Sequence, residues 1–346
     1  MSEIPQFTRV SDRPLLDLDA IRWPVKNPTI NYPTVIEAPR WISQPLDRLY
    51  MYYASHHGMG LGLASAPAPE GPWAVHGQIF TLDDAPMIAG HISSPDVLVD
   101  ERARRVYLYY HGSSAAGRGQ VMGCAVGYDG LHFEVENPRP LILPNEREGT
   151  WEGLTAAYLR PFRLGERIFG LYMGSGGAGV PGVSYNCQGI LRSSDYAHWE
   201  RVREEPLLAP DEREDWGTIR HCAVHVRDPK MFDVYYSTRT GPDLQREVLR
   251  MAHVDASVPP SQWQAEKLGT VLEPELDWEG GRAGCISSTR AELRPGSGWR
   301  WRNEPGGTLV DGHGAGVPLR DVARRHHDAG GDARTRRAAG AALRLR

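Results

Sequence analysis

The sequence has few cysteines, no long hydrophobic run and little net charge, and each of these shortages excludes a class of protein. Its four cysteines are far apart and form no C-x-x-C pair: Cys124, Cys187, Cys222 and Cys285. They therefore indicate reduced thiols rather than a disulfide framework. No apolar run approaches the ~18 residues that a membrane-spanning helix needs, so no membrane partner is expected.

The charge balance points away from nucleic acids. A net charge of −4 and an isoelectric point near 6.4 offer no basic surface for such a partner, and none is expected. The first residues, MSEIPQFTRVSDRPLL, have no basic stretch followed by an apolar core, so no secretory signal is expected. Together with the reduced cysteines, this predicts a cytoplasmic location.

Long amphipathic helical patterns are also missing. The chain has 38 glycines and 27 prolines, and turn signals such as PEGPW, GYDG and DPK keep interrupting its short apolar runs. Short runs separated by turns are typical of many short strands, so the sequence predicts an all-β protein.

What the chain does contain is an internal repeat. Four segments look alike: LYMYYASH, VYLYYHGS, IFGLYMGS and FDVYYSTR. Their matched tyrosines are 57, 62 and 64 residues apart: Tyr53, Tyr110, Tyr172 and Tyr236. Each segment follows another apolar run and precedes a small-residue strand and an aromatic residue: Trp73, Phe133, Trp199 or Trp263. One such unit predicts a four-stranded antiparallel blade with core aromatics, and radial stacking of blades buries both faces of each.

We therefore predict a five-bladed β-propeller whose fifth blade is incomplete or disordered. The predicted blades cover about residues 30–80, 89–145, 150–210, 215–272 and, in part, 278–295, after an N-terminal extension of residues 1–29. A β-sandwich of irregular hairpins is the alternative, and the fourfold match of the repeat argues against it.

The last 51 residues, 296–346, depart from the repeat. They hold ten Gly, ten Arg and eight Ala but no Phe or Tyr, and the ten Arg stand against five acids. This composition offers little apolar surface to offset the entropy of ordering. Three interpretations are open: a basic tail for an acidic partner, a disordered or weakly helical extension, or coding sequence translated out of frame. In the last case the true fifth blade is missing.

Two acidic motifs fall where inner strands of a propeller are expected to begin, next to the central channel. SSPDV places Asp96 directly behind a proline, and WEGL places Glu152 at the entry of the third blade. With these motifs the chain resembles the five-bladed propeller glycosidases of glycoside hydrolase family 43, over about residues 30–290. The resemblance implies that Glu152 is the general acid and that Asp96 orients it and tunes its pKa.

The blade-one motif departs from the family. The resemblance implies an Asp-Pro base there, but the stretch NYPTVIEAP has Tyr32 in that place, and Glu37 is the nearest carboxylate that could replace it. Glycoside hydrolysis needs one protonated carboxyl on the leaving oxygen and one ionised carboxylate facing water or the sugar. A third acid nearby raises the pKa of the donor.

Further polar residues near the expected inner strands are candidates for substrate binding: His91, His221, Arg220, Tyr32 and His56. Imidazole and guanidinium groups make directional hydrogen bonds to sugar hydroxyls or to a carboxylate. The histidine spacing matches no zinc motif, so no catalytic metal and no cofactor are expected.

Each candidate also has a structural interpretation. Asp96 could cap a turn or strand, and Glu37 could be a charged residue at a strand end. Glu152 could be a surface acid of the repeat, because DWEG recurs at Glu279. A lone histidine is most often a hydrogen-bonding residue of the fold.

Three hypotheses follow for function. The first is a glycosidase that cleaves a small carbohydrate or oligosaccharide in the axial pocket by general acid/base catalysis. The second is a carbohydrate-binding propeller without turnover, which the missing base favours. The third is an interaction scaffold, since a fold alone does not decide function.

Overall fold

The computed structural model describes most of the chain up to residue 276. Within 4–276 the exceptions are 6, 24, 26, 27, 57, 118, 146–149, 177–185, 212–217 and 241–245, and beyond it residues 279, 286–287, 290–292 and 304–305 are described. The chain divides into two units, residues 1–310 and 311–346. The second unit, and with it most of the tail for which three interpretations were open, lies outside the described residues.

Four-stranded antiparallel units make up most of the described chain. The first has β1 (Asn31–Glu37), β2 (Leu49–Ala54), β3 (Gly60–Ala66) and β4 (Ala74–Thr81). The second has β5 (Ile88–Asp100), β6 (Arg105–Ser114), β7 (Gln120–Gly127) and β8 (Phe133–Glu134). The third has β9 (Thr155–Leu164), β10 (Arg167–Ser175), β11 (Asn186–Ser193) and β12 (Trp199–Arg201). The fourth has β13 (Ile219–Asp228), β14 (Met231–Thr240), β15 (Arg246–Asp255) and β16 (Ala265–Leu272).

The remaining elements are short. There are three short 3-10 turns in the described chain. η1 (Leu18–Ala20) precedes β1, η2 (Leu82–Asp84) lies between β4 and β5, and η3 (Pro260–Gln262) lies between β15 and β16. The second and third units are joined in one sheet by a parallel pair between Gln120 and Thr155. The all-β class that the turn signals predicted is confirmed.

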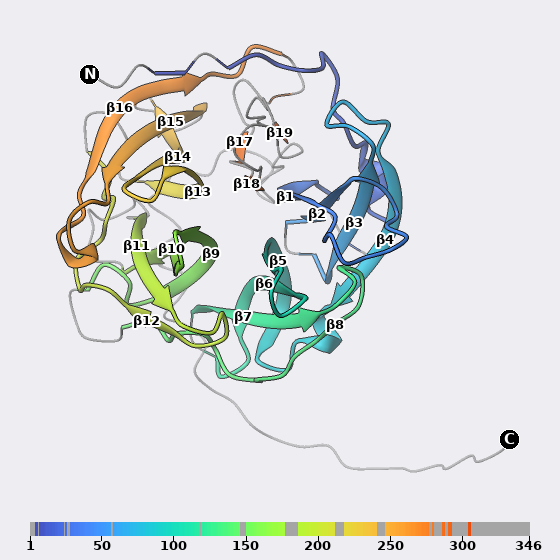
Figure 1. The fold of residues 1–346 in the computed structure, drawn as a ribbon, viewed down its shortest axis with the longest axis horizontal. Coiled ribbons are helices and arrows are strands. Elements are labelled where there is room, and N and C mark those ends of the chain that lie inside the picture. Colours follow the sequence, from blue (N-terminus) through green and yellow to red (C-terminus); the bar gives the residue numbers. More distant parts are fainter. Residues whose placement is uncertain are drawn as a thin grey trace, which may run out of the picture. The chain divides into compact units, whose positions relative to one another are not determined.

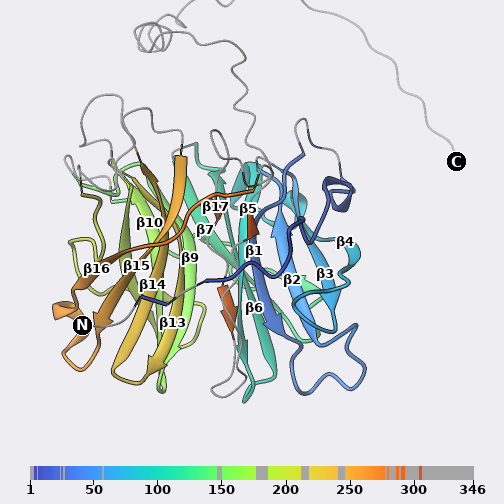
Figure 2. The same cartoon turned by 90° about the horizontal axis from the view of Figure 1, so that it is seen from above.

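The four units stand around a common centre, with the first strand of each unit innermost (Figure 1). β1, β5, β9 and β13 therefore surround the axis, and the later strands lie toward the rim. Seen at right angles, the strands of the units stand side by side, with loops at both ends (Figure 2). This arrangement brings the inner-strand side chains of all four units to one place.

The space between neighbouring units is the core. One cluster joins the first and second units through side chains such as Tyr52, Phe80 and Leu108. Another joins the third and fourth units around Phe162, Phe232 and Trp263. Stacked sheets bury their faces in this way, and burial of apolar area is the main favourable term in folding. The repeated aromatics Phe133, Trp199 and Trp263 are buried as predicted, whereas Trp73 is half-buried.

The repeated tyrosines each lie opposite a glycine in three of the units. Cross-strand partners are Tyr53 with Gly62, Tyr110 with Gly123 and Tyr172 with Gly189. A Cβ atom on any of these glycines would lie 2.3–2.6 Å from the tyrosine ring. The glycines are therefore required by the close approach of the ring, which is why small residues follow each Tyr-Tyr strand in the sequence. In the fourth unit Tyr236 pairs with Arg250 instead.

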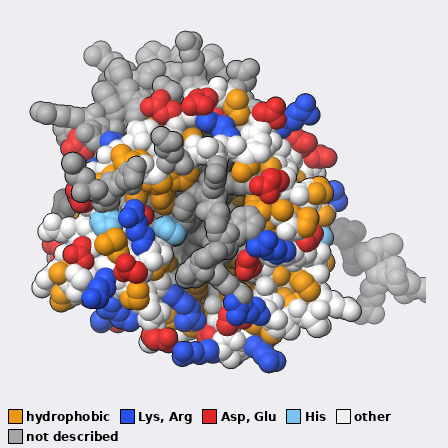
Figure 3. Space-filling model, turned by 45° about the horizontal axis from the view of Figure 1, so that its top comes forward, with side chains coloured by type: hydrophobic (Ala, Val, Ile, Leu, Met, Phe, Trp, Pro, Cys, Tyr) orange, Lys and Arg blue, Asp and Glu red, His pale blue; other side chains and the backbone are white. Residues whose placement is uncertain are grey.

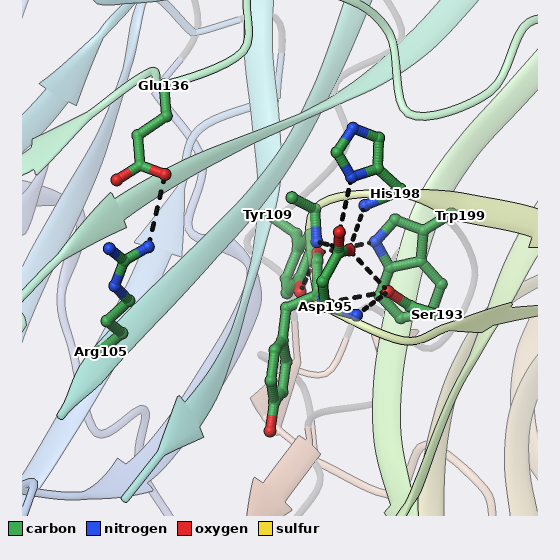
Figure 4. A network of polar contacts seen from close by, with 9 residues as sticks. Arg105, Tyr109, Glu136, Ser193, Asp195, His198 and Trp199 are labelled. Atoms are coloured by element: carbon green, nitrogen blue, oxygen red, sulfur yellow. Dashed lines mark hydrogen bonds and ion pairs between the residues drawn. The ribbon is translucent and has the colours of Figure 1, made fainter. Parts of the chain in front are cut away.

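The outer turns of the second and third units share an Asp-x-x-His motif. In the third unit, Asp195 accepts a hydrogen bond from the ring of His198 at 2.7 Å and from two backbone amides (Figure 4). Asp129 and His132 repeat the same contacts in the second unit. In each turn the carboxylate accepts hydrogen bonds from backbone N–H groups that have no backbone carbonyl as partner.

The N-terminal segment lies against two units that are far apart in sequence. Phe7 packs edge-on against Tyr235 of β14, with ring centroids 5.4 Å apart, and Trp23 stacks on Tyr53 of β2 at 5.9 Å. Figure 1 shows this dark blue segment passing from β16 toward the first unit. Within the predicted extension of residues 1–29, Phe7 and Trp23 thus pack against the fold.

The sector between the fourth and first units holds short strands. They are β17 (Ile286–Ser287), β18 (Arg290–Glu292) and β19 (Glu304–Pro305). β18 runs parallel to β1, with Thr34 opposite Arg290, and β17 pairs with β19. The remainder of the predicted fifth blade lies outside the described residues.

Candidate functional site

Each inner strand carries a β-bulge at the same place. Two residues of the inner strand lie opposite one residue of the second strand, and the first bulged residues are Tyr32, Ser94, Tyr158 and Arg220. The φ angles of Tyr32, Ser94 and Tyr158 are 55°, 49° and 60°. Positive φ is unfavourable for side chains of this size, and such strain gathers at functional sites. Bulges redirect side chains, and here they do so next to the axis.

The bulge explains the unusual Ser-Pro-Asp stretch. Asp96 does not begin a strand, as the sequence suggested, but lies well inside β5. Pro95 is tolerated there because the bulge leaves its position out of the ladder, so the missing backbone N–H costs no hydrogen bond.

Imidazole and phenol rings from four units pack together at the axis. We call them the axial cluster: Tyr32, His56, His91, His111, Tyr158 and His221. The His221 ring centroid lies 4.4 Å from that of Tyr32 and 4.7 Å from that of Tyr158. The His111 ring lies 4.1 Å from Tyr158. The structure therefore brings together four predicted binding residues, Tyr32, His56, His91 and His221, and adds His111 and Tyr158.

Hydrogen bonds fix the edges of the axial cluster. The Tyr32 hydroxyl lies 3.1 Å from Nδ1 of His56, and the Ser113 hydroxyl lies 3.2 Å from Nδ1 of His91. At the centre, neither ring nitrogen of His221 has a hydrogen-bond partner among the described residues. The rings at the edge of the cluster are thus fixed by hydrogen bonds. The buried ring of His221 at its centre has two nitrogens that can hydrogen-bond to a ligand.

The central imidazoles are held neutral. Burial, followed by the charges of Arg220 and Arg160, lowers the pKa of His221 well below its usual value. Burial, followed by His91 and Arg160, lowers the pKa of His111 in the same way. A neutral imidazole has one nitrogen with a lone pair, so these rings stay unprotonated at neutral pH and can take up a proton only transiently, during a reaction.

Asp96, on the inner strand β5, is fully buried. Its Oδ1 accepts hydrogen bonds from the Thr34 hydroxyl at 3.0 Å and from the backbone of Val97 at 2.7 Å. Its Oδ2 lies 3.3 Å from Nη1 of Arg160, which also donates to the carbonyl of Pro95 at 3.1 Å. Nε and Nη2 of Arg160 have no partner among the described residues. Asp96 therefore holds Arg160, whose charge is among those that lower the pKa values of His111 and His221.

Glu152 lies outside the axial cluster. It is buried, and Nε and Nη2 of Arg201 donate to its two oxygens at 2.7 and 2.9 Å. The Tyr172 hydroxyl donates to Oε2 at 2.7 Å. Burial, then the Glu152 charge, raises the pKa of Tyr172, so this hydroxyl remains a donor. Both carboxylate oxygens are engaged, which does not fit the expected general acid.

The recurrence of Trp-Glu-Gly has a structural meaning. Glu279 is also buried, and the guanidinium of Arg9 donates to both of its oxygens. The backbone amides of Glu275 and Leu276 donate to Glu279 as well. A bidentate arginine on a buried glutamate thus occurs at both Glu152 and Glu279, and it favours a structural role for Glu152.

Glu37 is also away from the axis. It is the last residue of β1, five residues from Tyr32, which corresponds to ~16 Å along a strand. Nη2 of Arg48 donates to its carboxylate at 3.2 Å. The structure does not bring Glu37 to the place of a catalytic base.

Arg220 shares the fourth bulge with His221. It is half-buried, and Nε2 of Gln188 donates to the carbonyls of Ile219 and Arg220 at 3.1 and 2.8 Å. These two hydrogen bonds hold the bulge that places Arg220 and His221 at the axis. On the face seen in Figure 3, histidine side chains reach the surface close to basic and acidic ones.

Two further features complete the description of the site. Within the described ranges, no group of three or more His, Cys, Asp or Glu side chains is arranged to hold a metal ion. None of the helices described there is long and apolar enough to cross a bilayer.

A separate groove of about 1190 Å³ lies between the second and third units, lined by residues such as Leu143, Leu154 and Arg201.

Comparison with known proteins identifies the class of fold. No family model matches the sequence. A curated relative, an uncharacterized protein of Acanthamoeba polyphaga mimivirus, is 26% identical over 285 residues, which are 75% of this chain and 72% of that protein. A thermostable family-43 glycoside hydrolase matches at a TM-score of 0.55 with 16% identity, over 76% of this chain and 81% of that one.

A second solved structure narrows the class. A GH43 enzyme from Xanthomonas citri complexed with xylose matches at a TM-score of 0.51 with 16% identity, over 80% of each chain. The fold is therefore a β-propeller. More particularly, it is the propeller fold of the family-43 glycoside hydrolases, as the acidic motifs suggested.

Proposed function

We propose that the protein binds a carbohydrate at the axial cluster and cleaves a glycosidic bond there. The observation that carries this proposal is the convergence of Tyr32, Tyr158 and His221 from three bulged inner strands of a propeller shared with glycoside hydrolases. Buried polar atoms, strained backbone and shifted pKa values in one place are typical of an active site.

The proposed roles follow from the contacts. His221 accepts the proton, because its ring is neutral and its nitrogens have no partner in the described part of the chain. Tyr32, next to His56, transfers a second proton on the other side of the bond. Asp96 is a positioning residue that acts through Arg160. Neither Glu152 nor Glu37 has a chemical role in this proposal.

The test uses a panel of aryl glycosides and oligosaccharides with the full chain. His221→Asn is expected to lower kcat by about 10²–10⁴-fold, which is the usual contribution of a proton-transferring group. Glu152→Gln is the matched control, and it is expected to lower stability while any remaining folded protein keeps its kcat. A wild-type protein that binds sugars but never cleaves them would instead establish the carbohydrate-binding alternative.

A further inference from the structure

The groove between the second and third units has no part in the proposed function so far. Its volume of about 1190 Å³ is large enough for a whole small molecule, since such sites usually measure about 300–1,000 Å³. Most of its lining is apolar, and two of its leucines are largely exposed to solvent, Leu143 at 63% and Leu154 at 59%. A ligand that covered these side chains would remove apolar surface from water, which is favourable.

The groove is built where the two units are joined. A Cβ atom on Gly119, just before β7, would collide with the carbonyl oxygen of Leu154, so this close approach requires a glycine. The backbone amide of Gln120 donates to the same carbonyl at 3.3 Å, and Gln120 pairs with Thr155. Backbone contacts between the two units therefore fix the shape of the groove before any ligand arrives.

The groove offers little to a charged ligand or to a sugar. Among the described residues that line it, Arg201 alone carries a charge, and the carboxylate of Glu152 neutralises that charge through bonds of 2.7 and 2.9 Å. The hydroxyl of Ser114 accepts a hydrogen bond from the amide of Ala116 at 3.2 Å. Sugar hydroxyls that left water for this groove would find few new partners, which costs free energy. An uncharged, apolar ligand fits the lining better.

The groove also lies within reach of the axial cluster. Ser114 ends β6, three residues beyond His111, and Leu154 directly precedes β9, the strand that carries Tyr158. At ~3.3 Å per residue, the groove begins ~10 Å along β6 from His111. One glycoside can span this separation, with its sugar at the axial cluster and the group linked to the sugar in the groove.

We propose that the groove binds the non-sugar part of the substrate, and that this part is an uncharged apolar group such as an alkyl chain or a fused aromatic ring. This inference rests on the proposed function and names its substrate class, a glycoside of an apolar alcohol or phenol. Leu143 and Leu154 pack against the apolar group. Affinity therefore increases by roughly threefold with each methylene group that enters the groove.

The test uses the full chain and alkyl arabinofuranosides, xylosides and galactosides whose chains run from methyl to decyl. Calorimetry gives Kd, and initial rates give KM where a bond is cleaved, at concentrations below those at which the chains form micelles. Affinity is expected to rise with chain length and then to level off once the groove is full. Equal affinity for the methyl and octyl glycosides of one sugar would overturn the inference and leave the proposed function standing.

Oligosaccharides of the same sugars provide the competing series. If affinity rose with each added sugar unit but not with alkyl length, the groove would be a sugar subsite and the inference would be wrong. Tighter binding of longer chains without any cleavage would support the inference and refute the cleavage step of the proposed function. If no member of either series bound, both proposals would be wrong.

A pair of matched variants locates the alkyl site. Leu154→Ser changes an exposed side chain of the groove, and substitutions at exposed positions usually change stability little. It is expected to lower the ratio of octyl to methyl affinity by about fivefold, because part of the apolar contact is lost. Leu46→Ser is the control, because it makes the same change at an exposed leucine in the loop between β1 and β2. If both variants lowered the ratio equally, or if neither did, the groove would not be the alkyl site.

Discussion

The guanidinium of Arg201 donates two hydrogen bonds to the buried carboxylate of Glu152, at 2.7 and 2.9 Å. This ion pair holds the loop that precedes β9 against β12, which is the outermost strand of the same unit. Removing one partner of a buried ion pair leaves the other charge uncompensated, which is far more costly than losing an exposed pair.

We therefore expect Glu152→Gln to lower the free energy of unfolding by about 3 kcal/mol. Urea titration of the wild type and the variant measures the change. Glu200→Gln removes the exposed contact with Arg192 and is expected to cost at most about 1 kcal/mol. Equal stability of the wild type and Glu152→Gln, together with lost activity, would restore Glu152 as the general acid.

The close approach of Tyr110 to Gly123 predicts the effect of one added methyl group. In Gly123→Ala the new Cβ atom would lie 2.5 Å from the tyrosine ring, so the ring or the strand must move. Overpacking of this kind costs about 1–3 kcal/mol. Thermal and urea unfolding of the variant measure the loss, and an unchanged midpoint would show that the ring moves aside freely.

Acid should destabilise the fold through its buried histidines. The pKa values of His111 and His221 are lowered in the folded state, mainly by burial, from an ordinary value of 6.5. Below about pH 6.5 the unfolded chain therefore binds more protons than the folded one, and the free energy of unfolding falls as the pH falls. Each histidine contributes up to about 1.4 kcal/mol per pH unit.

Urea titrations between pH 8 and pH 5 should show a plateau followed by this decline. His221→Asn is expected to make the decline shallower. If stability declined with the same slope in His221→Asn as in the wild type, protonation of His221 would not be a cause of the decline.

The contribution of Asp195, in the outer turn of the third unit, to the free energy of unfolding should be lost at lower pH. Hydrogen bonds from His198 and from backbone amides outweigh burial and lower the pKa of Asp195 from its ordinary value of 3.8 (Figure 4). Its contribution is therefore complete above about pH 4 and is lost as the pH falls through the lower folded-state value. Asp195→Asn is expected to be less stable than the wild type at pH 7, and the difference should shrink toward pH 3 in urea titrations.

The repeat in the sequence predicted the units because it depends on short-range patterns. Tyr53, Tyr110 and Tyr172 recur with a glycine on the following strand, and the alternation of a strand fixes which face both occupy. The all-β class and the propeller fold followed from this. The five-blade count stays a prediction, because the fifth unit lies largely outside the described residues.

The site was only partly predictable. Tyr32, His91 and His221 were found because they lie at the inner strands. The role of Glu152 as general acid was expected from the family resemblance alone. Its partner Arg201, 49 residues away, carries no local signal in the sequence.

Two members of the axial cluster were missed. Tyr158 could have been found by aligning AAYLRPF with NYPTVI, which puts it in the place of Tyr32. His111 stands next to the repeated Tyr110, but a histidine beside an aromatic strand does not by itself indicate which face it takes.

The N-terminal segment should hold the first and fourth units together. Arg9→Ala removes both bonds to the buried carboxylate of Glu279 and is expected to lower stability by about 3 kcal/mol. Limited proteolysis should then cut the segment around Phe7 faster than in the wild type. Arg13→Ala is the control, because it changes an exposed arginine of the same segment. Equal cleavage rates in the wild type and in Arg9→Ala would show that the ion pair does not retain the segment.

The position of this segment also bears on how the protein is made. Trp23 can stack on Tyr53 once the first unit has left the ribosome, but Phe7 and Arg9 must wait for Tyr235 and for Glu279, which is 270 residues further on. Contacts of such long sequence separation form late, because the intervening chain must be closed into a loop first. Phe7 and Arg9, which are synthesised before all four units, thus complete their packing after them, and Tyr235 of the fourth unit lacks its Phe7 contact until then.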